Sequence, residues 1–358
     1  MNEPNERLVE QWNGKQDALV LQYNELALST LANMVGSGTI DVAPQFQRRD
    51  RWATAKQSAL IESFLINLPI PPIYLSEEAG GKFSVIDGRQ RLTAIRMFFA
   101  DEFPLGRTEE LPELEGYRYS TLPQELRSAL DMRPLRSVTL MRQTDADIKY
   151  IVFHRLNSAG DVLNSQEIRN VIYRGPLNDM IYKLAEISFL RKQLKIDNVQ
   201  SSAYRKMQDV EFVLRFLTLS ETWRKFSGDL APSMDDFMAR RREASPAELK
   251  KFESRFIRAI EACQSIWGHH AFHRPDGNGW REQALAGLYD AQMIAMNEIT
   301  DHEIASLVAR KDEATQVLRK LFDNEEFDKA VRTGTNTPAR IQTRIEELTK
   351  TLRELLGR

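Results

Sequence analysis

The chain has 358 residues, 42% of them hydrophobic, and its 49 basic and 51 acidic residues leave a net charge of -2. This length and composition suffice for one large domain or two ordinary ones with real cores, and they exclude a disordered tail. The near-neutral charge argues against a protein that coats DNA through bulk electrostatics, so any nucleic-acid contact must be a local patch.

The cysteine content and the hydropathy pattern indicate in which cellular compartment the protein works. The single cysteine, Cys263, excludes an internal disulfide framework and a cysteine-built zinc site, and we expect it to be a buried, inert thiol. The first residues lack an apolar signal core, and no stretch reaches the roughly 18 uninterrupted apolar residues that a membrane span needs. We therefore expect a cytoplasmic protein that does not contact a membrane.

The first half of the chain predicts an α+β domain over residues 23–175, preceded by an N-terminal extension over residues 1–22. A helix over 29–34 and an extended segment over 40–42 are followed by a helix over 54–67. The proline-rich run 68–75 is extended, because proline fixes φ and disfavours helix in the residue before it. Residues 82–86 alternate like a strand after a glycine turn, so the two segments predict a hairpin that leads into a helix at Asp87. One further strand is expected over 137–141.

Beyond this strand the periodicity is mainly helical, so residues 176–358 are expected to form an α-helical domain with its boundary near Gly175. Helices are expected over 145–156, 165–173, 176–188, 208–220, 246–266 and 338–356. The last of these carries a heptad-like apolar stripe formed by Ile341, Ile345, Leu348, Leu352 and Leu355. We expect this helix to dock on its own domain, with a homodimer or partner interface as the alternative.

The segment from Phe83 to Arg96 is the most informative for chemistry, because a strand passes through a glycine turn directly into a helix. Such a junction presents free backbone N–H groups and the positive end of the helix dipole to an anion. Arg89 and Arg91 add guanidinium groups suited to phosphate. Asp87 can hold Mg²⁺ through water or orient an arginine, and Gln90 can position a water or a phosphate. The alternative is a helix start with Asp87 as its cap and two solvated arginines.

No familiar nucleotide motif accompanies this junction. The run Gly80-Gly81-Lys82 is followed by Phe83 rather than Ser or Thr and has no glycine at the upstream spacing of a Walker A loop. A dinucleotide-binding glycine fingerprint is absent as well. Any nucleotide must therefore be held by a less familiar cradle.

Four ordered motifs resemble the N-terminal domain family of GmrSD-type restriction endonucleases. Asp87-Gly-Arg-Gln-Arg91 is similar to the Asp-Gly-Gln-Gln-Arg motif of that family, with Arg89 in place of the first glutamine. Phe46-Gln47-Arg48 followed by Trp52, the run Leu68–Ile73, and the block Phe153–Arg169 resemble its other motifs. His154 departs from that last block, where an acidic residue is common, so no metal or base role is carried over to it.

The resemblance implies a ParB/sulfiredoxin-like fold that binds a nucleoside triphosphate with Mg²⁺, senses or hydrolyses it, and takes part in restriction of modified or invading DNA. It also implies site residues. Carried over to this sequence, the catalytic positions are Asp87, Gln90 and Arg91, and the phosphate-binding positions are Gly88, Arg89, Gln47, Arg48 and Asn157. Asp87 would also hold the Mg²⁺. Arg89 preserves phosphate attraction but puts any water-positioning role of that side chain in doubt.

Two basic stretches are weaker candidates for DNA contact. Arg49 and Arg51 make the loop before Trp52 basic, and Arg240 and Arg241 belong to the densest basic run of the chain. The alternative is a solvated loop, with Trp52 as a core anchor, and a solvated helix face. Asn164 and Glu167 have the spacing of a capping box, which favours a structural role for Glu167, while Arg169 and Asn170 stay open.

The histidines do not complete a nuclease. His269 and His273 have i, i+4 spacing, but Gly268 and Pro275 favour a helix end over a metal site, and no HNH arrangement is recognisable. We therefore expect a separate HNH-type nuclease or modification-system protein as partner. A non-catalytic DNA-binding adaptor of the same fold, or a metal-dependent nuclease using Asp87, are the alternative functions.

Overall fold

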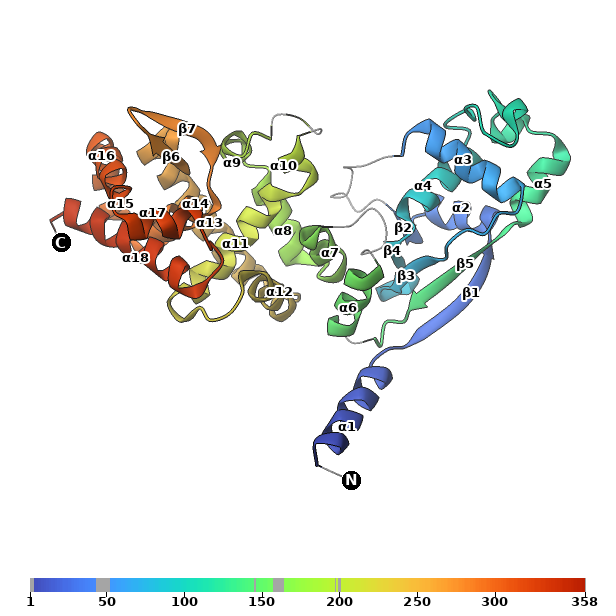
Figure 1. Ribbon diagram of the computed structural model, residues 1–358, viewed down its shortest axis with the longest axis horizontal. Coiled ribbons are helices and arrows are strands. Elements are labelled where there is room, and N and C mark those ends of the chain that lie inside the picture. The colour runs from blue at the N-terminus through green and yellow to red at the C-terminus, as the bar shows by residue number, and fades with distance from the viewer. Residues whose placement is uncertain are drawn as a thin grey trace. The chain divides into compact units, whose positions relative to one another are not determined.

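The computed structural model describes residues 3–42, 52–144, 146–156, 164–196, 198 and 201–357. The chain divides into two compact units, Met1–Ile172 and Tyr173–Arg358 (Figure 1). The sequence analysis had placed a boundary near Gly175. Among the described helices, none combines the length and the apolar character needed to cross a membrane.

The first unit is built on a five-stranded mixed sheet. Its strands are β1 (Leu21–Ala27), β2 (Ile40–Asp41), β3 (Ile73–Glu77), β4 (Phe83–Asp87) and β5 (Pro134–Leu140). They lie in the order β1-β5-β3-β4-β2, with antiparallel β1–β5 and β3–β4 pairs and parallel β3–β5 and β2–β4 pairs. The predicted β3–β4 hairpin is confirmed, whereas the edge strand β1 was not predicted.

Helices pack on the sheet to form the core of this unit. Those that supply the core are α2 (Leu28–Gly36), α3 (Thr54–Leu65), α4 (Arg89–Phe99) and α5 (Gln124–Met132). In α4, Leu92, Ile95 and Phe98 are fully buried because they recur at a spacing of three and lie on one helix face. Two further helices, α6 (Ala146–Leu156) and α7 (Ser165–Ile172), contact β4, while α1 (Glu3–Asp17) extends from the unit.

The second unit is mainly helical, with one small hairpin of β6 (His273–Asp276) and β7 (Gly279–Ala284). Its helices are α8 (Pro176–Ala185), α9 (Ser188–Gln193), α10 (Ser202–Arg205), α11 (Gln208–Thr222), α12 (Leu230–Arg240), α13 (Pro246–Trp267), α14 (Ala286–Glu298), α15 (Asp301–Ala309), α16 (Lys311–Leu321), α17 (Glu325–Arg332) and α18 (Pro338–Leu355). Short 3₁₀ turns at Ala79–Gly81, Pro112–Leu114 and Tyr119–Thr121 in the first unit, and at Trp223–Lys225 and Gly268–His270 in the second, connect longer elements.

Helix α14 is the centre of the second unit. Every residue from Gly287 to Met296 is buried, which is the pattern of a helix that is surrounded by others rather than lying at a surface. It contacts α11, α13, α17 and α18. A Cβ atom at Gly287 would lie 2.4 Å from the carbonyl oxygen of Val331, so the close approach of α17 requires glycine there.

The C-terminal helix α18 docks on this centre. The apolar side chains Ile341, Ile345, Leu348 and Leu352 are fully buried, and α18 contacts α14, α16 and α17. This confirms the expectation that the heptad-like stripe packs on its own domain. The alternative, a homodimer or partner interface at this helix, stays a prediction, and the buried stripe does not support it.

A buried charge cluster connects α11, α14 and α18. Asp290 accepts hydrogen bonds from Arg215 at 2.6 and 2.7 Å, and its Oδ2 also accepts one from Arg344. The side chains of Asp290 and Arg344 are fully buried. Burial lowers the pKa of Arg344, while Asp290 acts in the opposite direction. One carboxylate is therefore shared by two guanidinium groups that have little access to water.

Removing this carboxylate should destabilise the second unit strongly. We expect Asp290→Asn to lower the free energy of unfolding by about 3–5 kcal/mol, because it leaves two buried cations without their counter-ion. Urea unfolding measures the loss, and hydrogen exchange of α14 localises it. Asp236→Asn breaks the exposed ion pair with Arg240 on α12 and should cost less than about 1 kcal/mol. Equal effects of the two substitutions would contradict this account.

Candidate functional site

The candidate site is the turn between β4 and α4. Gly88 is the N-cap of α4 and has a φ of 95° in the left-handed region, and no side chain caps the helix. A Cβ atom at this position would lie 2.5 Å from Cγ2 of Ile73 on β3, so both the backbone angle and the neighbouring strand require glycine. The first backbone N–H groups of α4 thus have no side-chain cap, which is the arrangement that binds anions at helix starts. The alternative of Asp87 as the cap is wrong.

Arg91 holds this turn in place. Its Nη2 donates to Oδ2 of Asp87 at 2.6 Å, and its Nη1 donates to the carbonyl oxygens of Pro71 and, at 3.3 Å, of Pro72. Only 11% of its side chain is exposed, and burial lowers its pKa while Asp87 raises it. The guanidinium therefore ties the strand–turn–helix motif to the proline run. The alternative of a solvated Arg91 is wrong, and in this arrangement Arg91 is a positioning residue.

The side chain of Asp87 is partly exposed to solvent beside the turn. Its side chain is 40% exposed although one of its oxygens accepts the hydrogen bond from Arg91. On the sheet it pairs with Tyr74 of β3, next to a β-bulge. The pair with Arg91 agrees with the expected alternative that Asp87 orients an arginine, and its i, i+4 spacing is the sequence signal for it. The bonds from Arg91 to the proline carbonyl oxygens were not anticipated.

Arg89 and Gln90 occupy the first turn of α4 and are half-buried. The Oε1 atom of Gln90 accepts a hydrogen bond from the backbone N–H of Trp52 at 3.3 Å. Trp52 packs against the hydrophobic core and Lys56 lies over its ring, which confirms the expectation of a core anchor. The candidates Gln47, Arg48, Arg49 and Arg51, as well as Asn157, lie outside the described residues.

The helix α7 adds buried polar groups close to β4. Glu167 and Asn164 form the predicted capping box, with reciprocal hydrogen bonds of 2.9 Å. Behind it, Gln166 accepts from Arg169 and donates to Asn170, both at 3.3 Å, and all three side chains are buried. Sequence analysis left Arg169 and Asn170 open and did not single out Gln166. Because α7 contacts β4, this network supports the strand that carries Asp87.

The second basic stretch is engaged within its own unit. Arg241 pairs with Glu221 and lies 4.5 Å from the centre of the Phe237 ring, and Arg240 pairs with Asp236 one turn away. Arg241 therefore serves the packing of α12 on its neighbours. The geometry favours the structural interpretation for Arg241, whereas Arg240 is exposed enough to meet a ligand.

The histidine cluster follows the end of α13. The helix terminates at Trp267 with Gly268 as its C-cap, which confirms the expected helix end. The ring of His270 stacks on Trp280 of the β6–β7 hairpin at 4.7 Å, so it contributes to packing. In the part of the chain that the structure describes, no group of three His, Cys, Asp or Glu side chains is arranged to hold a metal ion.

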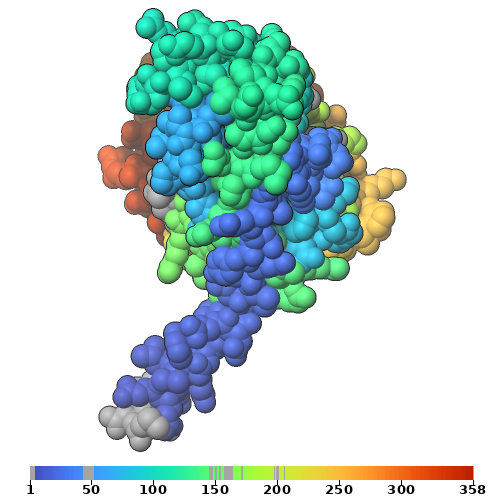
Figure 2. Space-filling model, turned by 90° about the vertical axis from the view of Figure 1, so that its right-hand side faces the viewer, coloured from blue at the N-terminus to red at the C-terminus, as the bar shows by residue number. Residues whose placement is uncertain are grey.

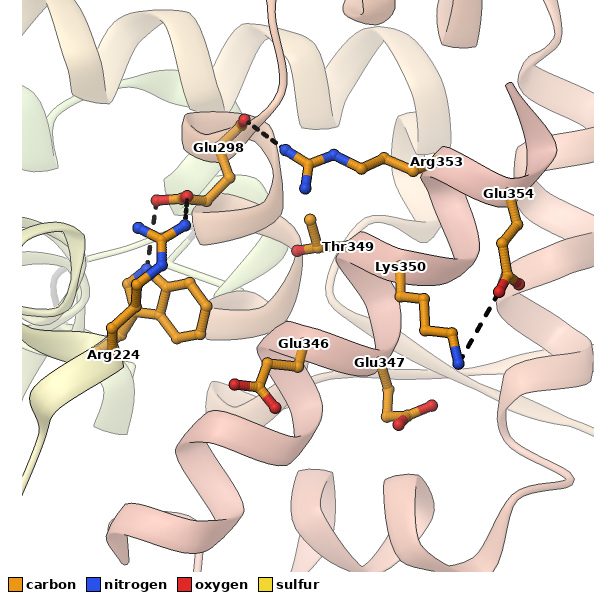
Figure 3. A pocket seen from close by; sticks show the side chains of 9 residues that line it. Arg224, Glu298, Glu346, Glu347, Thr349, Lys350, Arg353 and Glu354 are labelled. Atoms are coloured by element: carbon orange, nitrogen blue, oxygen red, sulfur yellow. Dashed lines mark hydrogen bonds and ion pairs between the residues drawn. The ribbon is translucent and has the colours of Figure 1, made fainter. Parts of the chain in front are cut away.

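The second unit has a groove of about 540 Å³ on its surface (Figure 3). It lies along α18 and is lined by both charge types. Its acidic groups are Glu298, Glu346, Glu347 and Glu354, and its basic groups are Arg224, Lys350 and Arg353. Arg224 pairs with Glu298, and Lys350 lies 3.9 Å from Glu354. This mixture of paired charges gives the groove no preference for phosphate.

The first unit is thus a mixed α/β domain whose strand–glycine–helix turn presents uncapped backbone N–H groups. Residues 28–174 match the family model for the GmrSD restriction endonuclease, N-terminal domain, so this part of the chain is similar to that domain. The matched segment is less than half of the chain and ends where the second unit begins. No curated protein and no solved structure gave a significant match.

The backbone angle and close neighbour of Gly88 predict how much a substitution there lowers stability, and Gly81 serves as the control. Gly88→Ala should lower the free energy of unfolding by about 2–4 kcal/mol, because left-handed strain adds to the overlap with Ile73. Gly81→Ala meets the same kind of strain, at a φ of 71°, but open space. It should therefore cost only about 1–2 kcal/mol. Thermal unfolding of both variants measures the difference, and equal losses would show that contact with Ile73 is unimportant.

Proposed function

We propose that this protein is a cytoplasmic, nucleotide-binding component of a DNA restriction or anti-phage defence system, which hydrolyses a nucleoside triphosphate. The phosphates would be held at the turn formed by Asp87, Gly88 and the first residues of α4. The match of residues 28–174 to the GmrSD N-terminal family supports the link to restriction. We further propose that the domain has the ParB/sulfiredoxin-like fold implied by its motifs.

The uncapped start of α4 is the observation that carries the phosphate site. Gly88 has no side chain with which to cap the helix, and the backbone N–H groups of a helix start of this kind can bind an anion. Arg89, in that same turn, adds a charge-assisted donor. The turn is preorganised, since Arg91 is fixed by Asp87 and by the proline carbonyls before any ligand arrives.

Magnesium fits this arrangement through Asp87. Mg²⁺ is usually held by one or two carboxylates together with phosphate oxygens and water, and Asp87 supplies a half-exposed carboxylate beside the turn. The ion would neutralise charge on the phosphates during transfer to water. Gln90 would contribute by placing the phosphate or water, while its Oε1 holds the backbone of Trp52.

DNA and a separate nuclease complete the proposal. The HNH arrangement was not found in the sequence, so cleavage would be supplied by an HNH-type nuclease or a modification-system protein that binds this chain. A non-catalytic DNA-binding adaptor is the second candidate, supported by the basic side chain of Arg89 where the family motif has a neutral glutamine. The third candidate, a metal-dependent nuclease using Asp87, has less support because, among the described residues, no group of three His, Cys, Asp or Glu side chains could hold a metal ion without a nucleotide.

Nucleotide binding tests the proposal most directly, with Arg89→Ala as the variant. Titration calorimetry with ATP, GTP, CTP and UTP in Mg²⁺ should show binding to the unaltered chain. Loss of one charge-assisted hydrogen bond should weaken this binding roughly 10- to 150-fold. Arg96→Ala, in the last turn of the same helix, removes the same charge and an ion pair with Glu102, and it should leave affinity unchanged. Phosphate release, with and without DNA, measures hydrolysis.

The outcomes separate the candidate functions. Binding of no nucleotide by the unaltered chain would overturn the proposal, and nucleotide-insensitive DNA binding would then favour the adaptor. Mg²⁺-dependent DNA cleavage without nucleotide would favour the nuclease. Arg91→Ala is a poor test by itself, because Arg91 holds the turn and its loss would disturb the fold as well as the site.

A further inference from the structure

One row of side chains crosses four strands of the sheet in the first unit. Tyr23 of β1 lies opposite Val138 of β5, and Val138 lies opposite Tyr74 of β3. Tyr74 in turn lies opposite Asp87, the residue at which β4 leads into the candidate turn. Side chains directly opposite one another in neighbouring strands lie on one face of a sheet. The carboxylate beside the candidate turn and the two tyrosines therefore share a face.

A groove on this face is lined by both tyrosines. It has a volume of about 490 Å³, and Pro72 and Val138 complete its apolar lining. That volume falls in the range of about 300–1,000 Å³ that is usual for small-molecule sites. The edge strand β1 forms one side of the groove, and Figure 2 shows this blue segment at the surface where it continues from α1. Tyr23 is 66% exposed, so the groove is open to a ligand from solvent.

The groove and the candidate turn belong to one continuous surface. Pro72, which lines the groove, has the carbonyl oxygen that accepts a hydrogen bond from Arg91 at 3.3 Å. Because neighbouring strands lie about 4.8 Å apart, the three strand intervals from Asp87 to Tyr23 span about 14 Å. An extended nucleoside triphosphate can bridge that distance, with its phosphates at the turn and its base in the groove.

The spacing of the tyrosines suits a planar ring. Tyr23 and Tyr74 stand on the two strands beside β5, so their Cα atoms are about 10 Å apart, with the smaller Val138 between them. Every nucleobase has a π face, so each of them can stack on an aromatic side chain. Aromatic walls with an apolar floor are therefore a suitable subsite for a nucleobase.

The rim of the groove favours an uncharged group. Glu25 and Arg136 form an ion pair at 3.1 Å there, and both side chains are more than half exposed. A surface for a phosphate backbone needs an excess of basic side chains, whereas the described lining has one base balanced by one acid. A nucleobase is neutral, and its edges carry donors and acceptors that this pair and the amide of Asn24 can meet.

We propose that this groove holds the base of the nucleotide whose phosphates bind at the turn formed by Asp87–Arg89, with the base stacked between Tyr23 and Tyr74. This inference rests on the proposed function and adds to it a subsite outside the Asp-Gly-Arg-Gln-Arg motif. The turn fixes the position of the triphosphate, and the groove adds the affinity that distinguishes a nucleotide from a bare polyphosphate.

Titration calorimetry in Mg²⁺ tests the groove, with ATP, GTP, CTP, UTP and inorganic tripolyphosphate as ligands. The unaltered chain should bind at least one nucleotide more tightly than tripolyphosphate, which has the phosphates but no base. Tyr23→Ala removes a stacking ring, so it should weaken the binding of that nucleotide roughly 5- to 150-fold and leave tripolyphosphate unaffected.

Two further variants serve as controls. Tyr23→Phe keeps the ring and should bind nucleotide like the unaltered chain. Tyr117→Ala removes a partly exposed tyrosine that does not line the groove, and it should also leave the affinity unchanged. Circular dichroism and thermal unfolding check that each variant keeps its fold.

The results separate the base subsite from the phosphate site. Nucleotide affinity that Tyr23→Ala does not change would overturn the subsite, and so would an equal loss for nucleotide and tripolyphosphate. Tripolyphosphate binding as tight as that of every nucleotide would also overturn it, because the base would then contribute nothing. In each of these cases the phosphate site stands. Binding of neither kind of ligand by the unaltered chain would overturn the proposed function, and the subsite with it.

Discussion

The bond network of Arg91 is the interaction on which the candidate site depends. A single guanidinium joins Asp87 at the end of β4 to the carbonyl oxygens of Pro71 and Pro72 before β3. It therefore sets where the strand stops, how the glycine turn is aimed and where α4 begins. Two sequence motifs that lie far enough apart to look independent are one structural feature, and this explains why a proline run accompanies the Asp-Gly-Arg-Gln-Arg segment.

The residues of this motif fall into two groups, those that shape the turn and those that are partly exposed beside it. Gly88 is required by the space available beside Ile73, and Arg91 is required by its buried partners, so both serve the shape of the turn. Asp87, Arg89 and Gln90 are only half-buried and remain the groups that can meet a ligand. Arg89, where the similar family motif has glutamine, thus belongs to the partly exposed group rather than to the residues that shape the turn.

Local signals in the sequence predicted much of the fold and part of the site. The spacing of Asn164 and Glu167 gave the capping box, the prolines gave the extended run before β3, and apolar periodicity gave the burial of α18. Edge strand β1 was missed because its sequence mixes polar and apolar residues without alternation, so that only pairing with β5 makes it a strand. The buried Arg215–Asp290–Arg344 cluster was missed because its members are far apart in sequence, and no local pattern marks a charge as buried. The bonds from Arg91 to the carbonyl oxygens of Pro71 and Pro72 were missed for the same reason, because they join two separate segments of the chain.

The position of α18 in the second unit has a consequence for synthesis on the ribosome. The helix at residues 338–355 supplies fully buried apolar side chains and the second arginine on Asp290, although it is made after the other helices of the second unit. Until it emerges, the central helix α14 has an open apolar flank, and Asp290 is paired with Arg215 alone. The second unit must therefore finish folding late, and nascent chains at this stage expose the kind of surface that chaperones bind.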